Sequence, residues 1–441
     1  MTGALSRVLR ATACAIFIGT LTAGAANATE GYFQEGVSPR EKATGGAGVA
    51  DPRDALTIAN NPAGLVDVGT QANLDLTVFS PDRWYNATGT ALVAPGTYKS
   101  TGDAFFIPTM AFSRQIDGES AWGIAIYGNG GMNSAYNAAN AGPACPAGSF
   151  GVFCNGKAGV DLNQAFMSAG YAKRVGAFSF GVAPIVAIQM FRAYGLGAFG
   201  AFGLSSNPAE LSGNGTAWSV GGGLRAGVEW HATPTLRFGV AGATPIWSTS
   251  FEKYSGLFAN QGQFDIPGTI TVGTSYDILP MLTLLLDYKH IFYSGVPAIS
   301  NSPNFNGILF GAAGGPGFGW RDVDVVSFGA EWRATQDLIL RAGYSHNTNP
   351  ISSADVTMNI LAPGVITDHV SAGASYKVLP NASLEFAAVY APRQDVGGPE
   401  VTPFGATPGS NINIWMSQFE ITAGLTYYFD TPTNPVVVSK Y

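Results

Sequence analysis

The sequence predicts an all-β protein, a 14-stranded antiparallel transmembrane β-barrel with a small N-terminal plug, or hatch, in its lumen. Only 12% of the 441 residues are charged while 58 are glycine, and a water-soluble chain of this size needs more charge to cover its surface. After residue 28 no stretch is long and apolar enough for a membrane-spanning helix. The alternation of apolar with small or polar residues instead indicates the wall of a closed barrel.

The first 28 residues have the features of a secretory signal peptide. Arg7 and Arg10 give a positive start, residues 11–21 are apolar, and residues 26–28 are a small-residue cleavage site. The apolar run is too short to serve as a membrane anchor. We therefore expect residues 1–28 to be removed and the mature chain to begin at Thr29.

Residues 29–70 differ from the rest of the chain, because they are rich in Gly and Ala, carry charges of both signs and do not alternate. Asp51-Pro52 and Asn61-Pro62 suit the first positions of short helices. The glycines of residues 44–48 lack the spacing of a phosphate-binding loop. We expect this segment to fold as the hatch inside the barrel formed by residues 71–429.

Residues 71–429 contain 14 candidate strands, an even number that suits a bacterial barrel. In the last strand Phe419 and Ile421 share one face and Glu420 and Thr422 the other, which assigns the first pair to lipid and the second to the lumen. The expected strands are Gln71–Ser80, Ala104–Arg114, Ala121–Gly130, Leu162–Arg174, Gly176–Ala193, Ala217–Trp230, Leu236–Thr249, Phe264–Ile278, Met281–Ser294, Asp322–Arg333, Gln336–His346, Val365–Val378, Ala382–Pro392 and Asn413–Phe429.

The connections between these strands alternate in length. Those after even-numbered strands are tight and those after odd-numbered strands are long, as expected of short periplasmic turns and longer outer loops. We therefore expect a protein of the Gram-negative outer membrane, in contact with its lipid and lipopolysaccharide, with both chain ends in the periplasm. Residues 430–441 are then a C-terminal periplasmic extension.

One outer loop holds both cysteines that remain after residue 28. Cys145 and Cys154 lie in a polar, Gly-rich stretch, and an exported chain meets an oxidising compartment. We expect them to form a disulfide. No histidine lies near them, so a metal site is not indicated, and we expect no metal site and no cofactor elsewhere in the chain.

Two further outer loops are apolar, which suggests a surface that captures a hydrophobic ligand. The alternative is that these loops pack only on each other. The candidate capture residues are Leu196, Phe199, Phe202 and Leu204 in the first loop and Phe251, Leu257 and Phe258 in the second.

Gly128, Asn129, Gly130 and Gly131 lie at the outer end of the third strand. Glycines inside a strand pattern mark a bulge or a bend, and a broken ladder in a membrane wall needs internal partners for its backbone groups. The alternative is that these residues simply begin the long loop.

Charged residues of both signs face the expected lumen, so we expect them to pair with one another and with the hatch. A subset is available to hold a ligand carboxylate, for which Arg is the natural partner. The wall charges are Arg225, Glu229, Asp287, Lys289, Glu331, Arg333, Arg341, Glu385 and Glu420, and the hatch charges are Arg40, Glu41, Lys42, Asp51, Arg53 and Asp54.

Two classes of function find no support. The four histidines are scattered, with His231 in a short turn and the others on separate strands, so no nucleophile, base and orienting group come together. The net charge of −7 without a basic cluster gives no reason to expect nucleic acid. We expect neither an enzyme nor a nucleic-acid-binding protein.

Several motifs occur in an order that resembles the FadL/TodX family of outer-membrane transporters for long-chain fatty acids and aromatic hydrocarbons. The resemblance covers essentially the whole mature chain. The motifs are Asn61-Pro62-Ala63 with the Gly/Ala-rich run before it, Phe105-Phe106-Ile107-Pro108, Trp122–Gly128, Gly319–Asp322, and Leu340–Tyr344 followed by Asn349-Pro350-Ile351.

The resemblance implies a monomeric barrel that catches its ligand between apolar outer loops and releases it sideways through a kinked third strand. Carried over, the groove involves Phe199, Phe202, Leu204, Leu257 and Phe258, the lateral gate is Gly128–Gly131, and the hatch element beside the gate is Asn61-Pro62-Ala63. The chain departs from the family at its end, where Phe429 is followed by twelve more residues. Either these form an extension or Tyr441 is the terminal aromatic residue.

The leading hypothesis is therefore passive uptake of hydrophobic molecules, either fatty acids, aromatic hydrocarbons or related lipids. The alternative is a general diffusion porin for small polar solutes, with the hatch as its constriction. A structural or adhesive surface barrel is a third reading. The apolar loops and the lack of a one-sign charge ring favour the first.

Overall fold

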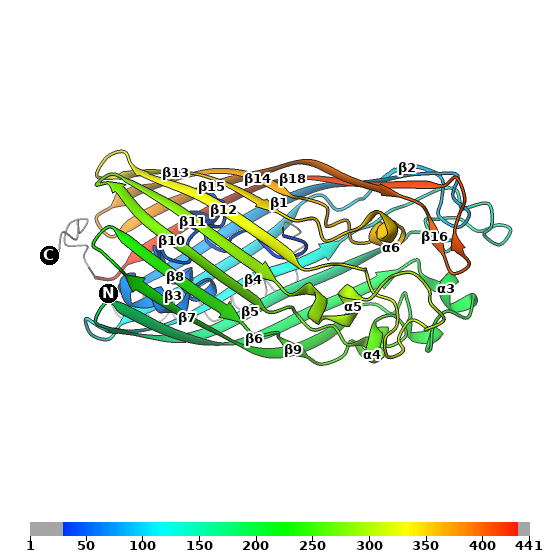
Figure 1. The fold of residues 1–441 in the computed structure, drawn as a ribbon, viewed down its shortest axis with the longest axis horizontal. Helices are drawn as coiled ribbons and strands as arrows, with labels where there is room; N and C mark the ends of the chain where they lie inside the picture. The colour runs from blue at the N-terminus through cyan, green and yellow to red at the C-terminus, as the bar shows by residue number, and fades with distance from the viewer. Residues whose placement is uncertain (1–29, 431–441) are drawn as a thin grey trace, which may run out of the picture.

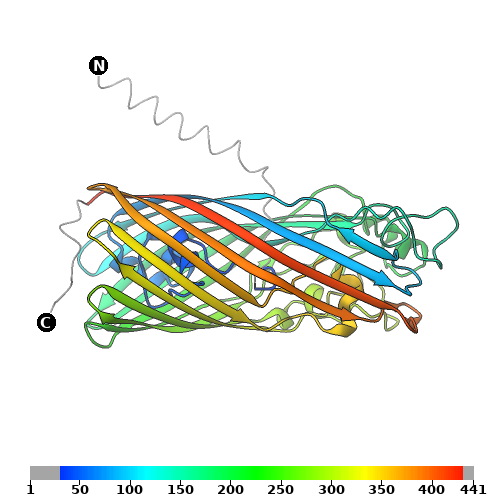
Figure 2. The same cartoon turned by 90° about the horizontal axis from the view of Figure 1, so that it is seen from above.

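The structure, a computed structural model, describes residues 30–430, so the expected signal peptide and residues 431–441 of the expected extension lie outside the described part. The chain forms one closed antiparallel barrel of 14 strands (Figures 1 and 2), in which the last strand pairs with the first from Gln71 with Tyr428 to Thr88 with Asn411. The barrel strands are β1 Gln71–Thr88, β3 Phe105–Gln115, β4 Ser120–Asn133, β5 Gly159–Val175, β6 Phe178–Tyr194, β7 Ala217–His231, β8 Leu236–Ala243, β10 Thr269–Leu279, β11 Leu282–Ile291, β12 Val323–Arg333, β13 Leu338–Asn347, β14 Asp368–Leu379, β15 Ala382–Gly398 and β18 Asn411–Tyr428.

The alternation predicted for the wall is confirmed. In β18, Phe419 and Ile421 are exposed on the outer face while Glu420 and Thr422 are buried. The same pattern of exposed apolar and buried polar residues runs along β1 and β7. Because lipid contacts only the outer face, this arrangement satisfies both the membrane and the interior.

Each expected strand corresponds to one observed strand, but prolines shift several ends. The seventh and eighth strands are shorter than expected, because β8 stops before Pro245 and β10 begins after Pro267. Strand β1 is longer than expected and passes through Pro81. Pro81 lies beyond the last β1–β3 pair, Phe79 with Phe105, where the strand has a free edge and a missing N–H is tolerated.

Residues 30–70, which we call the hatch segment, fold into three short helices inside the outline of the barrel (Figure 2): α2 Pro39–Ala43, η1 Ala55–Ala59 and η2 Pro62–Asp67. Asn61 caps η2 as predicted, since its side chain accepts from the backbone N–H of Ala63 at 3.1 Å. The start expected at Asp51-Pro52 is wrong. The Asp51 carboxylate instead accepts from Arg53 at 2.7 Å and from Arg237 of the wall.

The long connections gather at one end of the barrel, opposite the end that carries the short turns (Figure 1). Cys145 and Cys154 are joined there by a disulfide. The loop elements are β2 Gly96–Lys99, α3 Gly197–Ala201, η3 Pro208–Glu210, β9 Trp247–Ser248, η4 Glu252–Tyr254, α4 Ala259–Gly262, η5 Tyr293–Gly295, α5 Pro297–Ser300, η6 Ser353–Asp355, α6 Val356–Asn359, β16 Val401–Thr402 and β17 Gly405–Ala406.

Within residues 30–430, none of these helices has both the length and the apolar character that crossing a membrane requires.

Candidate functional site

The wall has a gap between β3 and β4. The two strands pair from Gln115 with Ala121 only as far as Met110 with Ile126, although β3 continues to residue 105 and β4 to residue 133. Residues 105–109 and 127–133 therefore face each other without a ladder. We call this region the β3–β4 gap.

On its other edge, β4 carries a bulge at the level of the gap. Gly128 pairs with Ala165 of β5 and Gly130 with Gln164, so Asn129 is the extra residue. A bulge bends its strand and changes the direction of its neighbours. The residues predicted as the lateral gate, Gly128–Gly131, thus lie at an irregularity of a wall strand, and the alternative that they only begin a loop is wrong.

The sequence explains why the ladder stops here. Pro108 of β3 has no N–H to donate to a neighbouring strand. Gly130 of β4 has no side chain, and a Cβ at this position would lie 1.9 Å from the carbonyl oxygen of Tyr32. The glycine therefore lets the hatch segment approach the backbone of β4 where β3 does not.

The hatch segment supplies the backbone partners that β3 leaves out. The N–H of Gln34 donates to the carbonyl oxygen of Asn129 at 3.2 Å, and the N–H of Gly131 donates to that of Tyr32 at 3.1 Å. The side-chain Nε2 of Gln34 donates to the carbonyl oxygen of Gly128 at 2.6 Å. Polar backbone groups that line a break in a membrane wall need internal partners, and here residues 32–34 provide them.

The expectation that Asn61-Pro62-Ala63 lies beside Gly128–Gly131 is wrong. These three residues pack on β6 and β7, where a Cβ at Gly181 would lie 2.2 Å from the carbonyl carbon of Pro62 and one at Gly227 would lie 2.0 Å from Asn61 Oδ1. Glycines of the wall make room for the turn at this place. The hatch residues beside the gap are Tyr32, Phe33 and Gln34.

A small apolar cavity of about 20 Å³ adjoins the gap on the lumen side, and we call it the Arg83 pocket. Its wall includes residues of β1, β4 and β18 and of two outer loops. The lining side chains include Phe79, Arg83, Met132, Trp320, Pro363 and Met416.

Arg83 is the unusual member of this pocket, because it is only 3% exposed. Its guanidinium donates to the carbonyl oxygens of Asn133 and Gly102 and lies over the ring of Phe105, 5.6 Å from its centroid. Among residues 30–430, the Nε atom finds no hydrogen-bond partner. Within the described residues no carboxylate oxygen approaches the Arg83 side chain within 4.0 Å, so the pocket holds a positive charge without an anion.

Arg83 was not among the residues expected from the sequence, because the first strand was expected to end at Ser80. Had the alternation been continued through Pro81, Arg83 would have fallen on the inward face with Phe79.

The residues predicted to capture ligand fall into two aromatic clusters at the loop end. The ring of Phe199 contacts those of Phe153 and Phe310, with centroids 5.6 and 5.7 Å apart. This cluster and Leu204 line a cavity of about 40 Å³. In the second cluster, Phe258 packs on Phe264, with centroids 4.9 Å apart.

Most of the predicted capture residues are buried, and Phe202 is the exception at 37% exposed. The two loops are joined, since Ser205 Oγ donates to the carbonyl oxygen of Gly256 at 2.7 Å. Phe310 and Met358 line the same cavity from two other loops, and neither was among the residues expected from the sequence.

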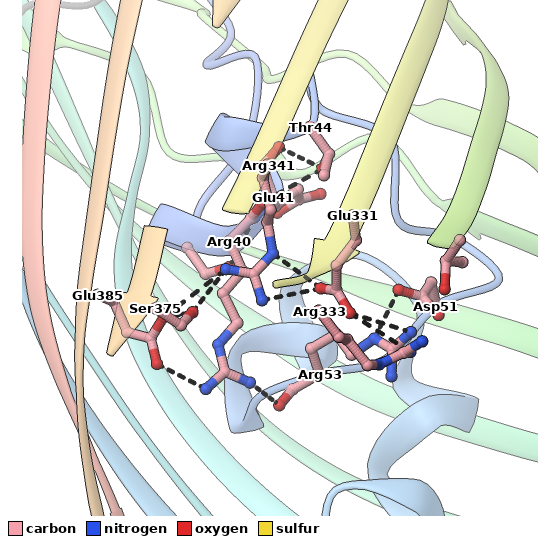
Figure 3. Close-up of polar contacts among 12 residues, drawn as sticks. Arg40, Glu41, Thr44, Asp51, Arg53, Glu331, Arg333, Arg341, Ser375 and Glu385 are labelled. Atoms are coloured by element: carbon pink, nitrogen blue, oxygen red, sulfur yellow. Dashed lines mark hydrogen bonds and ion pairs between the residues drawn. The ribbon is translucent and has the colours of Figure 1, made fainter. Parts of the chain in front are cut away.

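The expected pairing of lumen charges with the hatch is observed for several of the residues (Figure 3), while Arg225, Asp287, Glu41 and Asp54 form no ion pair within residues 30–430. Arg40 of α2 contacts Glu385 at 2.6 Å, and Arg53 contacts Glu331 at 3.5 Å. Glu331 is also held by Arg341 at 2.8 Å. Further pairs join Lys42 to Glu420, Arg237 to Asp51 and Lys289 to Glu30. The hatch segment is therefore anchored on several sides of the barrel.

The sequence model of the family described as outer membrane protein transport protein (OMPP1/FadL/TodX) matches residues 19–411. The search of curated proteins finds no match. Among solved structures, the P. putida toluene transporter TodX is similar with a TM-score of 0.66 and 17% identity, over 90% of this chain and 99% of that chain. A Pseudomonas aeruginosa FadL homologue gives 0.65 and 16%, over 90% and 100%.

The Ralstonia pickettii toluene transporter TbuX is similar with a TM-score of 0.61 and 20% identity, over 90% of this chain and 99% of that chain. At these identities the structures establish the fold, and the family match establishes the family. The chain belongs to the OMPP1/FadL/TodX family of outer membrane transport proteins.

Proposed function

We propose that this barrel takes up hydrophobic molecules passively, binding them at the Arg83 pocket, which widens from about 20 Å³ to admit them, and releasing them sideways through the β3–β4 gap into the outer membrane. The observation that carries the proposal is the position of an apolar pocket beside the one stretch where β3 and β4 do not pair. The aromatic clusters of the outer loops are the proposed first contact for ligand. Relatives of similar fold are described as toluene transporters or as a FadL homologue.

Sideways exit is favoured by the free energy of the ligand. Each methylene that leaves water contributes about 0.8 kcal/mol, so a chain of about ten methylenes gains on the order of 8 kcal/mol before ordering costs. Exit into the bilayer preserves this burial, whereas exit into the periplasm along the barrel axis would forfeit it. The ion pairs between the hatch segment and the wall also favour a hatch that stays in place.

The charge of Arg83 influences which kind of ligand the pocket favours. A buried guanidinium without an anion is costly, and a ligand that brings a carboxylate to this place removes part of that cost. Charge-assisted hydrogen bonds between Arg and carboxylate are among the strong ones. The pocket therefore favours an apolar molecule with an acidic end, such as a fatty acid, over a plain hydrocarbon.

The protein is placed in the outer membrane by its family. We propose further that it is a monomer in contact with lipid and lipopolysaccharide, that its loop end faces outward, and that both termini are periplasmic. These proposals follow from the single closed barrel and from the short turns at the other end.

Uptake into proteoliposomes tests the lateral route. Gly128→Val adds a β-branched side chain where a Cβ would lie 2.9 Å from Ile107 Cγ2 across the gap, and we expect it to reduce uptake of a radiolabelled fatty acid. Gly222→Val is the matched control, because this glycine faces outward on β7 with only the Ile185 carbonyl oxygen near, at 4.0 Å.

Two results would overturn the proposal. Fatty acid uptake by Gly128→Val equal to that by Gly222→Val would exclude exit through the gap. Free passage of sugars through the wild-type protein would identify a diffusion porin instead.

A further inference from the structure

A second cluster of side chains lies at the short-turn end of the barrel, away from the Arg83 pocket. It consists of Asp67, the last residue of η2, and Glu229 and His231 at the end of β7. One ligating atom from each of the three lies within 4.8 Å of the other two. The sequence led us to expect no metal site, because no histidine lies near the two cysteines; Asp67 is far from Glu229 and His231 along the chain.

The two carboxylates meet the same atom of the imidazole. His231 Nε2 lies 3.2 Å from Glu229 Oε1 and 3.6 Å from Asp67 Oδ2. Apart from this ion-pair contact, His231 Nε2 and both carboxylate oxygens of Glu229 have no hydrogen-bond partner among residues 30–430. One ring nitrogen carries at most one proton, so a proton alone does not satisfy both carboxylates.

Glu229 needs a positive partner in this arrangement, which either a protonated imidazole of His231 or a metal ion supplies. Its side chain is 0% exposed, and a buried carboxylate without hydrogen bonds is destabilising. Neither neighbouring arginine pairs with Glu229 among the described residues. Arg174 pairs with Asp67 through Oδ1, which leaves Oδ2 directed at His231, and Arg237 pairs with Asp51.

We propose that Asp67, Glu229 and His231 bind a divalent transition metal, with Zn²⁺ as the probe that tests it. Imidazole nitrogen and carboxylate oxygen are both ligands of Zn²⁺, and three protein ligands with water in the fourth position is a common arrangement. Ligands at about 2.0–2.1 Å in a tetrahedron lie about 3.3 Å apart, which is close to the separations of 3.2 and 3.6 Å at His231.

The site links two parts of the molecule. Asp67 belongs to the hatch segment, and Glu229 and His231 belong to the wall. A bound metal therefore clamps the C-terminal end of the hatch segment to β7. This assignment is independent of the proposed transport route, since it concerns the opposite end of the barrel.

His290 provides a matched control within the same chain, because it also lies between two carboxylates. Its Nδ1 contacts Asp324 Oδ1 at 2.7 Å and its Nε2 contacts Asp322 Oδ2 at 3.7 Å. The two carboxylates are thus on opposite sides of the ring and do not converge on one ion. We expect His290→Ala to leave metal binding unchanged.

Isothermal titration of tag-free protein in detergent, first stripped with a chelator, measures the site directly. We expect the wild type and His290→Ala to bind one Zn²⁺ per chain, and His231→Ala and the isosteric Glu229→Gln to bind at least tenfold more weakly. Zinc should also raise the melting temperature of the wild type and not that of Glu229→Gln. Zinc X-ray absorption should show one nitrogen and oxygen ligands.

Three outcomes would overturn the assignment. They are no saturable Zn²⁺ binding by the wild type, equal weakening by His231→Ala and His290→Ala, or Mg²⁺ binding as tight as that of Zn²⁺. Circular dichroism of each variant confirms that the barrel is folded, and Glu229→Gln keeps the test valid if His231→Ala does not fold.

Discussion

The backbone N–H of Gln34 donates to the carbonyl oxygen of Asn129 at 3.2 Å, so the hatch segment pairs with the bulged residue of β4 beside the β3–β4 gap. The hatch segment thereby forms hydrogen bonds with β4 at the level where β3 does not pair with it. Movement of residues 32–34 would expose polar backbone groups of β4, and the hatch segment and the gap are therefore coupled.

Gly130→Val should break this coupling. The new Cβ would lie 1.9 Å from the Tyr32 carbonyl oxygen, which forces residues 32–34 away from β4. Hydrogen–deuterium exchange should then become faster at the amides of Gln34 and Gly131, while the barrel strands keep their protection. Gly222→Val is the control, and equal exchange in both variants would contradict the coupling.

The buried ion pairs should stabilise the hatch segment against the wall. Glu331→Gln removes the carboxylate charge that pairs with Arg53 of the hatch segment at 3.5 Å and with Arg341 of the wall at 2.8 Å. Breaking a buried pair in this way costs about 3–5 kcal/mol. Urea unfolding in lipid vesicles measures the loss, and single-channel conductance should rise as the hatch segment loosens.

Asp82→Asn is the matched control for that experiment. Asp82 pairs with Lys99 at 2.8 Å, but both side chains are nearly half exposed, so the loss should be within about 1 kcal/mol. An equal loss of stability from the two substitutions would mean that the ion pairs with the wall do not hold the hatch segment in place.

The strands could be predicted because their signal is local. Each wall strand alternates over its own length, so β18 could be identified without any knowledge of its neighbours. The ends of the strands were harder to predict, because the effect of a proline depends on whether its edge of the strand is paired. Pro245 and Pro267 ended strands, whereas Pro81 at a free edge did not.

The gap and its partners could not be predicted in the same way, because they depend on pairing between distant segments. The glycines of β4 indicated an irregularity, but not that Tyr32 would occupy the space above Gly130. Likewise the Asp67–His231 contact joins two segments that carry no shared pattern. The alternation would have placed Arg83 on the inward face, and this residue was missed only because the first strand was expected to end at Ser80.

Glu35 of the hatch segment should make hatch stability depend on pH. Burial raises the pKa of its carboxyl to about 8, with Glu30 and Glu420 adding to the rise and the Ser345 hydroxyl opposing it. Between the unfolded pKa of about 4.5 and the raised folded value, the folded protein keeps a proton on Glu35 that the unfolded chain has lost. The stabilisation is therefore fully present below about pH 4.5, and it is lost as the pH rises through the folded pKa.

Thermal unfolding between pH 5 and pH 8.5 measures this dependence. The melting temperature should fall across the window in the wild type and less steeply in Glu35→Gln, which keeps the hydrogen bond to Ser345 at 2.7 Å without a charge. Glu119→Gln, in the exposed turn before β4, should leave the profile unchanged. A profile that Glu35→Gln does not flatten would assign the dependence to another group.

Arg83→Met should separate acidic from neutral ligands. The methionine fills much of the same apolar space but offers no donor, so a carboxylate loses a hydrogen bond to a charged group, worth about 1.5–3 kcal/mol. We expect fatty acid affinity to fall about 10-fold to 100-fold, while affinity for toluene is unchanged or slightly higher. Equilibrium binding of radiolabelled ligands to the purified protein measures both.

Arg393→Met controls for the loss of an arginine as such, because Arg393 lies over Trp415 at 4.4 Å on an exposed position of β15, away from the Arg83 pocket. Arg83→Lys keeps the charge but loses the planar fork, and it should recover only part of the affinity. If Arg83→Met weakened toluene and fatty acid equally, Arg83 would be a structural residue of β1. The pocket would then select ligands by shape and apolar contact alone.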